Sequence, residues 1–222
     1  MIPLRDVIRS RTPPVVTVTL ILVNAAAFFF ELSLPPVARQ GLIRDWGIVP
    51  ASFDWSTLFT SMFLHGGWLH VIGNMWYLWI CGDNVEDRLG HGRYLLFYLL
   101  CGAVAGVAQT LMNPSSAVPT IGASGAIAGV MGAYFVLYPR SRILTLVPLF
   151  VFIEIVEIPA LFFLGFWFLM QLFAGAGSIA HTTGSQGGVA FWAHVAGFVG
   201  GAGGVFVFKR PERQRVEWWH DG

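Results

Sequence analysis

Long apolar runs alternate with short polar segments along the chain, and six of the runs have the character of membrane-spanning helices. A helix needs about 20 apolar residues to cross about 30 Å of hydrocarbon. The 222 residues therefore suit one domain of six spans. The expected spans are 15–34, 68–82, 94–112, 124–139, 159–174 and 189–208. This pattern predicts an all-α polytopic membrane protein, a six-transmembrane-helix bundle.

The fourth expected span is short. It covers 15 residue steps from Ser124 to Pro139, which is roughly 22 Å at ~1.5 Å per residue. Because this is less than the hydrocarbon thickness, we expect the helix to begin below the membrane surface. Ser124, its first residue, would be submerged but reachable from one side.

Two carboxylates define where the fifth span begins. Glu154 and Glu157 interrupt an otherwise apolar stretch, and charged groups at mid-bilayer are costly. A helix that begins near Pro159 avoids this cost, because proline at the first helical position loses no intrahelical hydrogen bond. Residues 143–158 are then expected to lie at the membrane interface, and the glycine-rich segment 175–188 to form a mobile cap.

The polar ends divide the chain into a leader, a membrane domain and a tail, at 1–14, 15–208 and 209–222. We expect the basic leader to stay attached as an uncleaved anchor, because the apolar run behind it is longer than a usual signal-peptide core.

Two internal polar segments are also expected outside the hydrocarbon. Loop 35–57 contains Trp46 and Trp55, and tryptophan suits a segment lying at the membrane interface. Residues 83–90 form the most polar internal stretch and are expected to be a turn.

Composition agrees with a membrane protein and excludes other classes. With 55% hydrophobic residues, 11% charged residues and a mean hydropathy of +0.66, the chain is too apolar for an ordinary soluble domain. The net charge of +1 provides no basic surface for nucleic acid, so no nucleic-acid partner is expected. Cys81 and Cys101 fall inside apolar runs and are expected to be small buried side chains rather than a disulfide.

Lysine and arginine are distributed asymmetrically about the expected spans. Eleven lie in the leader, the second-to-third turn, the fourth-to-fifth connection and the tail, whereas only Arg39 and Arg44 lie on the opposite side. The positive-inside rule then places both termini in the cytoplasm. In this orientation Ser124 and His194 share a depth near the outer face of the membrane.

The segment Gly122-Ala123-Ser124-Gly125 places a serine among small residues at the start of the fourth span. Ala128, Gly129 and Gly132 follow at helical spacing. Small residues at this spacing let membrane helices approach closely, so packing alone is one explanation of the motif. The other explanation is that Ser124 is a nucleophile.

A second small-residue run favours the nucleophile. Ala193-His194 opens the last span, and Gly197 and Gly201 follow as a GxxxG face. Packing this face on the fourth span would bring His194 to Ser124, where it could take the serine proton and later give it to a leaving amine. No acidic residue is expected in a span at that depth to orient the imidazole, so the pattern indicates a dyad.

The position of Ser124 at a helix start would stabilise negative charge that develops beside it. The motif fails the GxSxG pattern of soluble hydrolases, so no nucleophile elbow is expected. Instead Ser124 begins a helix, whose free N–H groups favour developing negative charge.

His70 and Asn74 form a further polar pair, four residues apart on one face of the second span and toward the same end. Such residues either hydrogen-bond neighbouring helices to each other or belong to a functional site. Beside a serine and a histidine at the same depth, they are candidate donors to an oxyanion. His65 precedes them and is expected to support structure or water near the site.

Together these motifs resemble the rhomboid family of intramembrane serine proteases, in its bacterial six-span form. The resemblance is carried by His65-Gly66-Gly67-Trp68-Leu69-His70 with Asn74, Glu86-Asp87-Arg88-Leu89-Gly90, Gly122-Ala123-Ser124-Gly125, and Ala193-His194-Val195-Ala196-Gly197 with Gly201. It implies a Ser124/His194 dyad, an oxyanion site including His70 and Asn74, and transmembrane-protein substrates in a bacterial inner membrane. It also implies a gate formed by the fifth helix and its neighbouring loop. The bulky Phe166, Trp167 and Phe173 of this helix either fill and vacate a gap between helices or are lipid-facing or core side chains.

The chain departs from the family pattern at two places. Rhomboids often carry a Trp-Arg pair in the first long loop, but Ser56 follows Trp55 here. Many also place a tyrosine one turn after the nucleophile to stack on the histidine. Ala128 occupies that position, so His194 must be held by other groups.

The expected function is therefore a serine endopeptidase that needs no cofactor or metal. The alternative is an inactive rhomboid-like protein that binds client membrane helices without cutting them. A transporter is disfavoured because no charged residue is placed inside the bundle. A metalloprotease is disfavoured by the absence of HExxH, although His65, His70 and His194 are conceivable zinc ligands.

Overall fold

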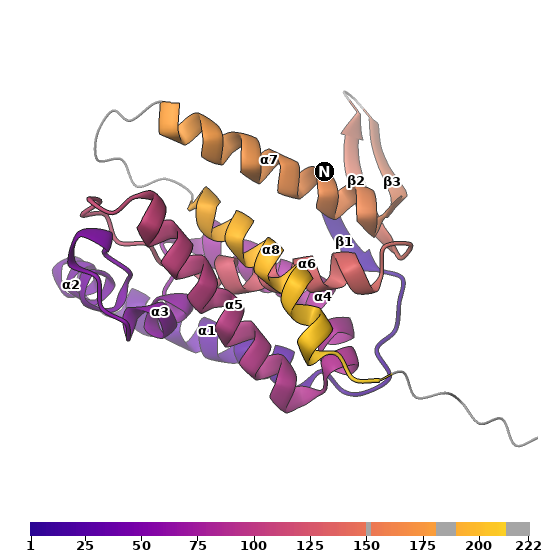
Figure 1. Cartoon of the computed structure of the whole chain (residues 1–222), viewed down its shortest axis with the longest axis horizontal. Helices are drawn as coiled ribbons and strands as arrows, with labels where there is room; N and C mark the ends of the chain where they lie inside the picture. Colours follow the sequence, from indigo (N-terminus) through magenta and orange to yellow (C-terminus); the bar gives the residue numbers. More distant parts are fainter. Residues whose placement is uncertain (150–151, 181–189, 212–222) are drawn as a thin grey trace, which may run out of the picture.

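A computed structural model describes residues 1–149, 152–180 and 190–211. Six long helices follow one another in the order of the expected spans and pack into a bundle (Figure 1). They are α1 (Val15–Ser33), α4 (Trp68–Leu89), α5 (His91–Met112), α6 (Ser124–Leu137), α7 (Ala160–Ala180) and α8 (Phe191–Phe208). The predicted helical, polytopic architecture is confirmed.

Four of the described helices are long and apolar enough to cross a membrane. They are α1, α5, α8 and the Ala160–Gly177 part of α7. The fourth helix in the expected series, α6, has 14 residues and is shorter, as predicted. The polar residues that follow Cys81 lower the hydropathy of α4. The chain is an integral membrane protein.

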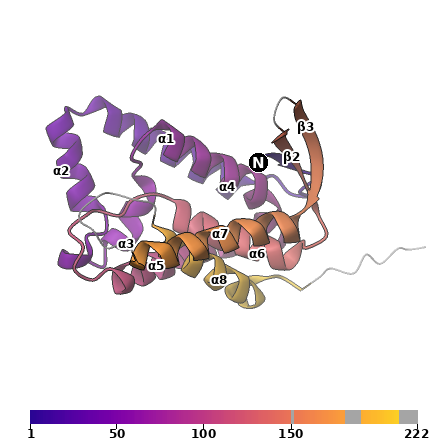
Figure 2. The ribbon, with the colours of Figure 1, turned by 90° about the horizontal axis from the view of Figure 1, so that it is seen from above.

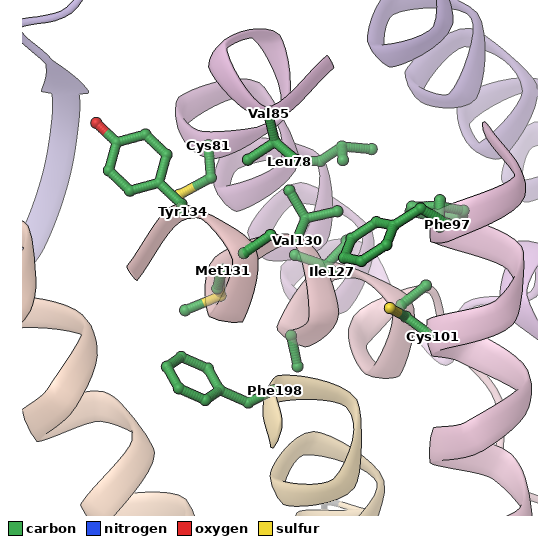
Figure 3. Close-up of a cluster of buried hydrophobic side chains, with 14 of the residues drawn as sticks. Leu78, Cys81, Val85, Phe97, Cys101, Ile127, Val130, Met131, Tyr134 and Phe198 are labelled. Atoms are coloured by element: carbon green, nitrogen blue, oxygen red, sulfur yellow. The ribbon is translucent and has the colours of Figure 1, made fainter. Parts of the chain in front are cut away.

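Helix α6 forms the centre of the bundle. Every residue from Gly125 to Tyr134 is buried, and its side chains meet those of three neighbouring helices (Figure 3). The contacting residues are Leu78, Cys81 and Val85 of α4, Phe97 and Cys101 of α5, and Phe198 of α8. Both cysteines are buried and free, as expected.

The crossing of α6 and α8 depends on glycine. A Cβ atom added at Gly197 would collide with the carbonyl oxygen of Gly125, and one at Gly201 would collide with that of Gly129. The lipid gives little hydrophobic force between helices, so close backbone approach and van der Waals contact stabilise this pair. The expected GxxxG packing is confirmed, and it fixes the relative positions of Ser124 and His194.

The polar segment 83–90 is not a turn, which corrects the sequence-based expectation. Helix α4 continues to Leu89, and the turn is reduced to Gly90 at φ 82°. The reason is the side chain of Glu86, which is fully buried and accepts hydrogen bonds from the backbone N–H groups of Val16 and Thr17 at 2.8 and 2.7 Å. A carboxylate at the N-terminus of α1 satisfies orphan donors and compensates for its own burial.

Backbone and side-chain contacts bring four polar segments together at one end of the bundle. Thr12 donates to Asp87, Val7 N–H donates to Arg142 O, and Arg88 exchanges hydrogen bonds with Arg210. The segments that hold most of the lysine and arginine are therefore neighbours in space.

A three-stranded antiparallel sheet at this end was not foreseen. It pairs β1 (Ile2–Asp6) with β2 (Arg142–Leu149), and β2 with β3 (Phe152–Pro159). Glu154 and Glu157 are exposed on β3 and so lie outside the helix, and α7 begins at Ala160. The expected start near Pro159 is confirmed. Residues 143–158 are expected from the sequence only as an interfacial segment, and the structure shows that those it describes form strands β2 and β3. Their position at the membrane interface stays a prediction.

The first long loop contains helical pieces, namely α2 (Pro36–Trp46), η1 (Pro50–Ser52), α3 (Thr57–Thr60) and η2 (Ser61–Phe63). Both Trp46 and Trp55 are exposed, which is compatible with the interfacial position expected for them. Figure 2 shows α2 beyond the end of α1, away from α7. Of the expected cap 175–188, the first six residues belong to α7. The rest of that cap, and tail residues 212–222, lie outside the described residues.

Asp6 gives the fold a testable pH dependence. Burial raises the pKa of Asp6 from 3.8 to about 6, opposed by the Tyr134 hydroxyl that donates to Oδ2 at 2.7 Å and assisted by the charge of Asp83. A carboxyl whose folded pKa is raised gives stability that is complete below its unfolded pKa and lost as pH rises through the folded value. We expect this contribution to the melting temperature in detergent to fall between pH ~4 and ~6 and to be absent in Asp6→Asn. An identical pH dependence in both proteins would contradict this.

Candidate active site

The small-residue packing of α6 and α8 brings Ser124 and His194 together. His194 Nε2 lies 2.8 Å from Ser124 Oγ. His194 is 9% exposed, and Ser124 is the first residue of α6, where the backbone N–H groups of the opening turn have no helical partner. The structure thus joins the two residues at hydrogen-bonding distance and next to a positive helix end.

The other side of the imidazole is held by α7. His194 Nδ1 lies 2.8 Å from Gln171 Oε1, and the Trp167 indole lies against the ring at a centroid distance of 5.8 Å and an interplanar angle of 37°. Ala128 is fully buried, in contact range of Gly197. Trp167 and Gln171 therefore supply the support that the family pattern assigns to a tyrosine at position 128.

These contacts determine where the imidazole carries its proton. With the Gln171 amide oriented so that its oxygen faces His194, that oxygen can only accept, and Nδ1 of His194 carries the proton. In the neutral ring Nε2 is then unprotonated and accepts the hydrogen bond of the Ser124 hydroxyl. The two hydrogen bonds therefore run in the same direction: the Ser124 hydroxyl donates to His194 Nε2, and His194 Nδ1–H donates to Gln171 Oε1.

His70 and Asn74 lie beside the backbone that leads into Ser124. A Cβ added at Gly122 would be 2.6 Å from His70 Nε2 and 3.6 Å from Asn74 Nδ2. His70 Nδ1 accepts a long hydrogen bond of 3.4 Å from Gly66 N–H, which leaves the ring proton on Nε2. Both side chains therefore present an N–H group to the backbone at Gly122, and both line the same cavity as Ser124.

Behind this pair lies a buried polar chain that includes an unexpected carboxylate. Asn74 Nδ2 donates to His65 Nε2 at 3.0 Å, and the backbone N–H of His65 donates to Glu31 Oε1 at 3.0 Å. Glu31 is fully buried on α1. The expectation that no acidic residue lies in a span at this depth is wrong. Its contact is nevertheless with His65, so the predicted supporting position of His65 agrees with the geometry.

The paired serine and histidine and the two candidate oxyanion donors line one cavity of about 970 Å³. Its wall includes Ser124, His194, His70, Asn74, Gln109 and Trp192. Gln109 Oε1 accepts a hydrogen bond from Ala193 N–H at 3.3 Å, so a polar side chain of α5 ties the start of α8 to the cavity wall. The mixture of apolar and polar groups suits a peptide substrate together with water.

The three aromatic residues named as gate candidates in the fifth span divide between the inward and the lipid-facing positions that the sequence left open. Phe166 and Phe173 are 52% and 69% exposed, and they lie on the outer side of α7. Trp167 packs inward against His194 and Phe198. The spacing explains the difference, because residues one or two positions from an inward residue lie on other faces of a helix.

Gln171 and Glu31 are the site neighbours that the sequence-based reasoning missed. Each is a polar residue inside an apolar span, and this is itself a signal of function or of a buried partner. Among the described residues, no group of three or more His, Cys, Asp or Glu side chains is placed to hold a metal ion.

Fold and site together define a polytopic membrane protein with a serine and a histidine paired inside its helical bundle. The Rhomboid domain family model matches residues 52–211. The chain belongs to the rhomboid family.

Individual relatives agree with this assignment. The chain is 41% identical to Rhomboid protease GluP of Bacillus subtilis over 83 residues, which are 37% of this chain and 16% of that protein. It is 32% identical to Rhomboid protein 1, mitochondrial, of Saccharomyces cerevisiae over 163 residues, which are 70% of this chain and 42% of the relative. It is 30% identical to the bovine presenilin-associated rhomboid-like protein, mitochondrial, over 135 residues, 59% and 36% of the two chains. The matched segments cover less than two thirds of each relative.

Gly122 offers a test of the geometry before Ser124. Its φ of 121° disfavours any residue with a side chain, and a Cβ would press on His70. We expect Gly122→Ala to lower the unfolding free energy by about 1–3 kcal/mol and to reduce turnover by displacing His70. Gly203→Ala on α8 is the control, because nothing lies within 4 Å of its Cβ position. Melting temperature and turnover equal to those of the control would contradict the prediction.

Proposed function

We propose that this chain is a serine endopeptidase that cleaves membrane-spanning segments of other proteins within the bilayer. The observation that carries the proposal is the 2.8 Å separation of His194 Nε2 and Ser124 Oγ at the wall of a polar-lined cavity. A serine within reach of a correctly protonated histidine is the minimal apparatus for acyl transfer. Membership of the rhomboid family supports the same function.

In the proposed reaction Ser124 Oγ attacks the scissile carbonyl carbon while His194 Nε2 accepts the serine proton. The tetrahedral intermediate then breaks its C–N bond, and His194 gives the proton to the leaving amine. The acyl group remains as an ester on Ser124. A water molecule that loses its proton to Nε2 attacks this ester, releases the carboxylic acid and restores the serine.

The negative charge of each tetrahedral intermediate needs donors. We assign this role to His70 Nε2–H, to the Asn74 Nδ2–H that is not used by His65, and to the free N–H groups at the start of α6. Donors that are fixed before reaction need no reorganisation as charge develops, so this arrangement favours the transition state over the bound substrate.

The substrate class follows from the location of the serine. Ser124 begins a short helix inside a bundle of membrane-spanning helices. A transmembrane substrate must unwind locally to present a carbonyl, because helical hydrogen bonds otherwise occupy it. We infer that the substrates are membrane proteins whose helices unwind readily near the outer face.

The orientation is part of the same proposal. The leader 1–14, the α4–α5 junction, the start of β2 and the end of α8 are joined by hydrogen bonds at the end of α6 away from Ser124. Their lysine and arginine content favours the cytoplasmic side. The proposal therefore has both termini in the cytoplasm, with 15–208 as the catalytic membrane domain of a bacterial inner-membrane protein and 209–222 as its tail.

Reconstitution with substrates tests the function. Wild-type protein and Ser124→Ala are incorporated into lipid vesicles with a panel of single-span proteins, and fragments are identified by mass spectrometry. We expect fragments cut within or beside the span with the wild type only. Stable binding of the panel without any cleavage by the wild type would overturn the protease proposal in favour of an inactive, client-binding rhomboid.

A further inference from the structure

Gln171 lies on the side of α7 that faces the bundle. The residues of this inward stripe are buried or half-buried at spacings that follow the helical period, whereas Leu161, Phe162, Phe166, Leu169, Met170 and Phe173 are exposed on the outer side. The stripe consists of Ala160, Phe163, Leu164, Trp167, Phe168 and Gln171. Gln171 is the one amide side chain among these described residues. A polar group in this position requires a partner, because lipid offers none.

The partner is the ring nitrogen of His194 that faces away from Ser124. Nδ1 lies 2.8 Å from Gln171 Oε1, while Nε2 lies 2.8 Å from Ser124 Oγ. An amide that only joined α7 to α8 could use any donor or acceptor on α8. The observed contact instead selects the imidazole tautomer whose Nε2 can accept the serine proton.

The hydrogen bond also links the dyad to the packing of α7. This helix meets α8 through Trp167 on His194, through Phe168 stacked on Phe198 at 4.8 Å, and through Gly175, which lies close to Phe191 and Trp192. Among the described residues, the outer side of α7 carries exposed apolar side chains and packs against no other helix. Because the Gln171–His194 hydrogen bond joins α7 to α8, an outward displacement of α7 would break it and leave Nδ1 without its acceptor.

We propose that Gln171 is a positioning residue that holds His194 in its reactive tautomer and makes the reactivity of Ser124 depend on α7 being packed against α8. This inference rests on the proposed protease function. A substrate helix that displaces α7 would break the hydrogen bond, so α7 must return to its place before Ser124 attacks. The Gln171–His194 hydrogen bond thus restricts proteolysis to substrates around which α7 has closed again.

The test compares Gln171→Met, which keeps length but cannot accept the hydrogen bond, with Gln171→Glu, which can. Met170→Leu on the exposed side of the same turn is the matched control. Two assays avoid passage of a helix between spans: hydrolysis of a short soluble peptide, and the rate at which a small fluorophosphonate labels Ser124. Both are measured across pH, together with the melting temperature.

We expect Gln171→Met to lower kcat and the labelling rate by about ten- to a hundredfold with little change in KM, because Nδ1–H loses its acceptor. Gln171→Glu should recover much of that loss. It should also move the acidic limb of the pH profile to higher pH, because a carboxylate stabilises the imidazolium and the ring must be neutral to act as a base.

The alternatives give different results. In one, Gln171→Met keeps the wild-type kcat, labelling rate and acidic limb of the pH profile while its melting temperature falls. In that case Gln171 only stabilises the packing of α7 on α8, and the inference is overturned. If the wild type neither cuts the peptide nor is labelled at Ser124, the protease function fails, and the positioning role fails with it. Full activity in the wild type and in Gln171→Met removes the positioning role alone.

Discussion

Replacing Ser124 with alanine is expected to reduce cleavage to the rate seen without enzyme, a loss of at least about 10⁴-fold. The reason is chemical, since the variant has no nucleophile. The fold should survive, because the serine hydroxyl makes a single described side-chain hydrogen bond, to His194, and alanine is the best helix former. The measurements are turnover of a membrane-embedded substrate and the melting temperature in detergent.

His194→Ala should abolish cleavage equally, although the two variants should differ in stability. Loss of the imidazole leaves the Gln171 side-chain oxygen without its hydrogen-bond donor and opens space beside Trp167. Gln171 is half-buried, and leaving a desolvated amide unpaired costs up to about 1–3 kcal/mol. His194→Ala should therefore melt at a lower temperature than Ser124→Ala while remaining folded.

Fluorophosphonate labelling separates the roles of the two residues. The reaction needs both the serine oxygen and the base, so neither variant should be labelled. Ser115→Ala, which changes an exposed loop serine, is the control and should be labelled like the wild type. Labelling of Ser124→Ala, or continued turnover in either variant, would show that the nucleophile is another residue.

The helices and the central pair could be predicted because the relevant information is local. Each apolar run identifies a helix, and the glycines at 129, 197 and 201 identify the faces that come closest. Once α6 and α8 pack along those faces, Ser124 and His194 meet without any further adjustment. Basic residues at alternate connections add the orientation.

What the sequence concealed depends on contacts between distant segments. Residues 2–6 and 142–159 form a sheet only because the leader returns to the connection before α7, and no local period announces that pairing. Likewise 83–89 contains charged residues that predict a turn, yet Glu86 remains helical because the start of α1 provides two N–H donors 69 and 70 residues away. The cost of burying a carboxylate cannot be judged before its partners are known.

Gln171 falls between these cases. Its spacing from Trp167 and Leu164 follows the helical period, so an inward position could have been predicted from the sequence. Its partner could not, because 23 residues separate it from His194 and the angle between α7 and α8 decides which atoms meet. Polar residues within predicted spans are thus reliable indications of a buried contact, but the contact itself requires the structure.

Removing an oxyanion donor is expected to give the second-largest loss of activity. Asn74→Ala and His70→Ala should each lower kcat by about 10²–10³-fold and change KM much less, because the donors act on the tetrahedral intermediate and not on the bound carbonyl. A short soluble peptide is the right substrate, since it does not have to pass between helices. The rate of phosphonate labelling should fall in parallel, because the adduct is tetrahedral and carries an oxygen at the same place.

The two variants should differ in stability in a way that the hydrogen bonds predict. Asn74 is also the hydrogen-bond partner of buried His65, so Asn74→Ala should lower the melting temperature. Among the described residues, the His70 side chain makes one long hydrogen bond, with Gly66, besides its ring contact with His65, so His70→Ala should affect the melting temperature less. Trp79→Phe, on the exposed side of the same helix, is the control for changes in α4 alone. If both variants melt at lower temperature while kcat and labelling hold, then His70 and Asn74 serve only to pack α4 against the segment before Ser124. The backbone N–H groups of α6 would in that case be the remaining donors to the oxyanion.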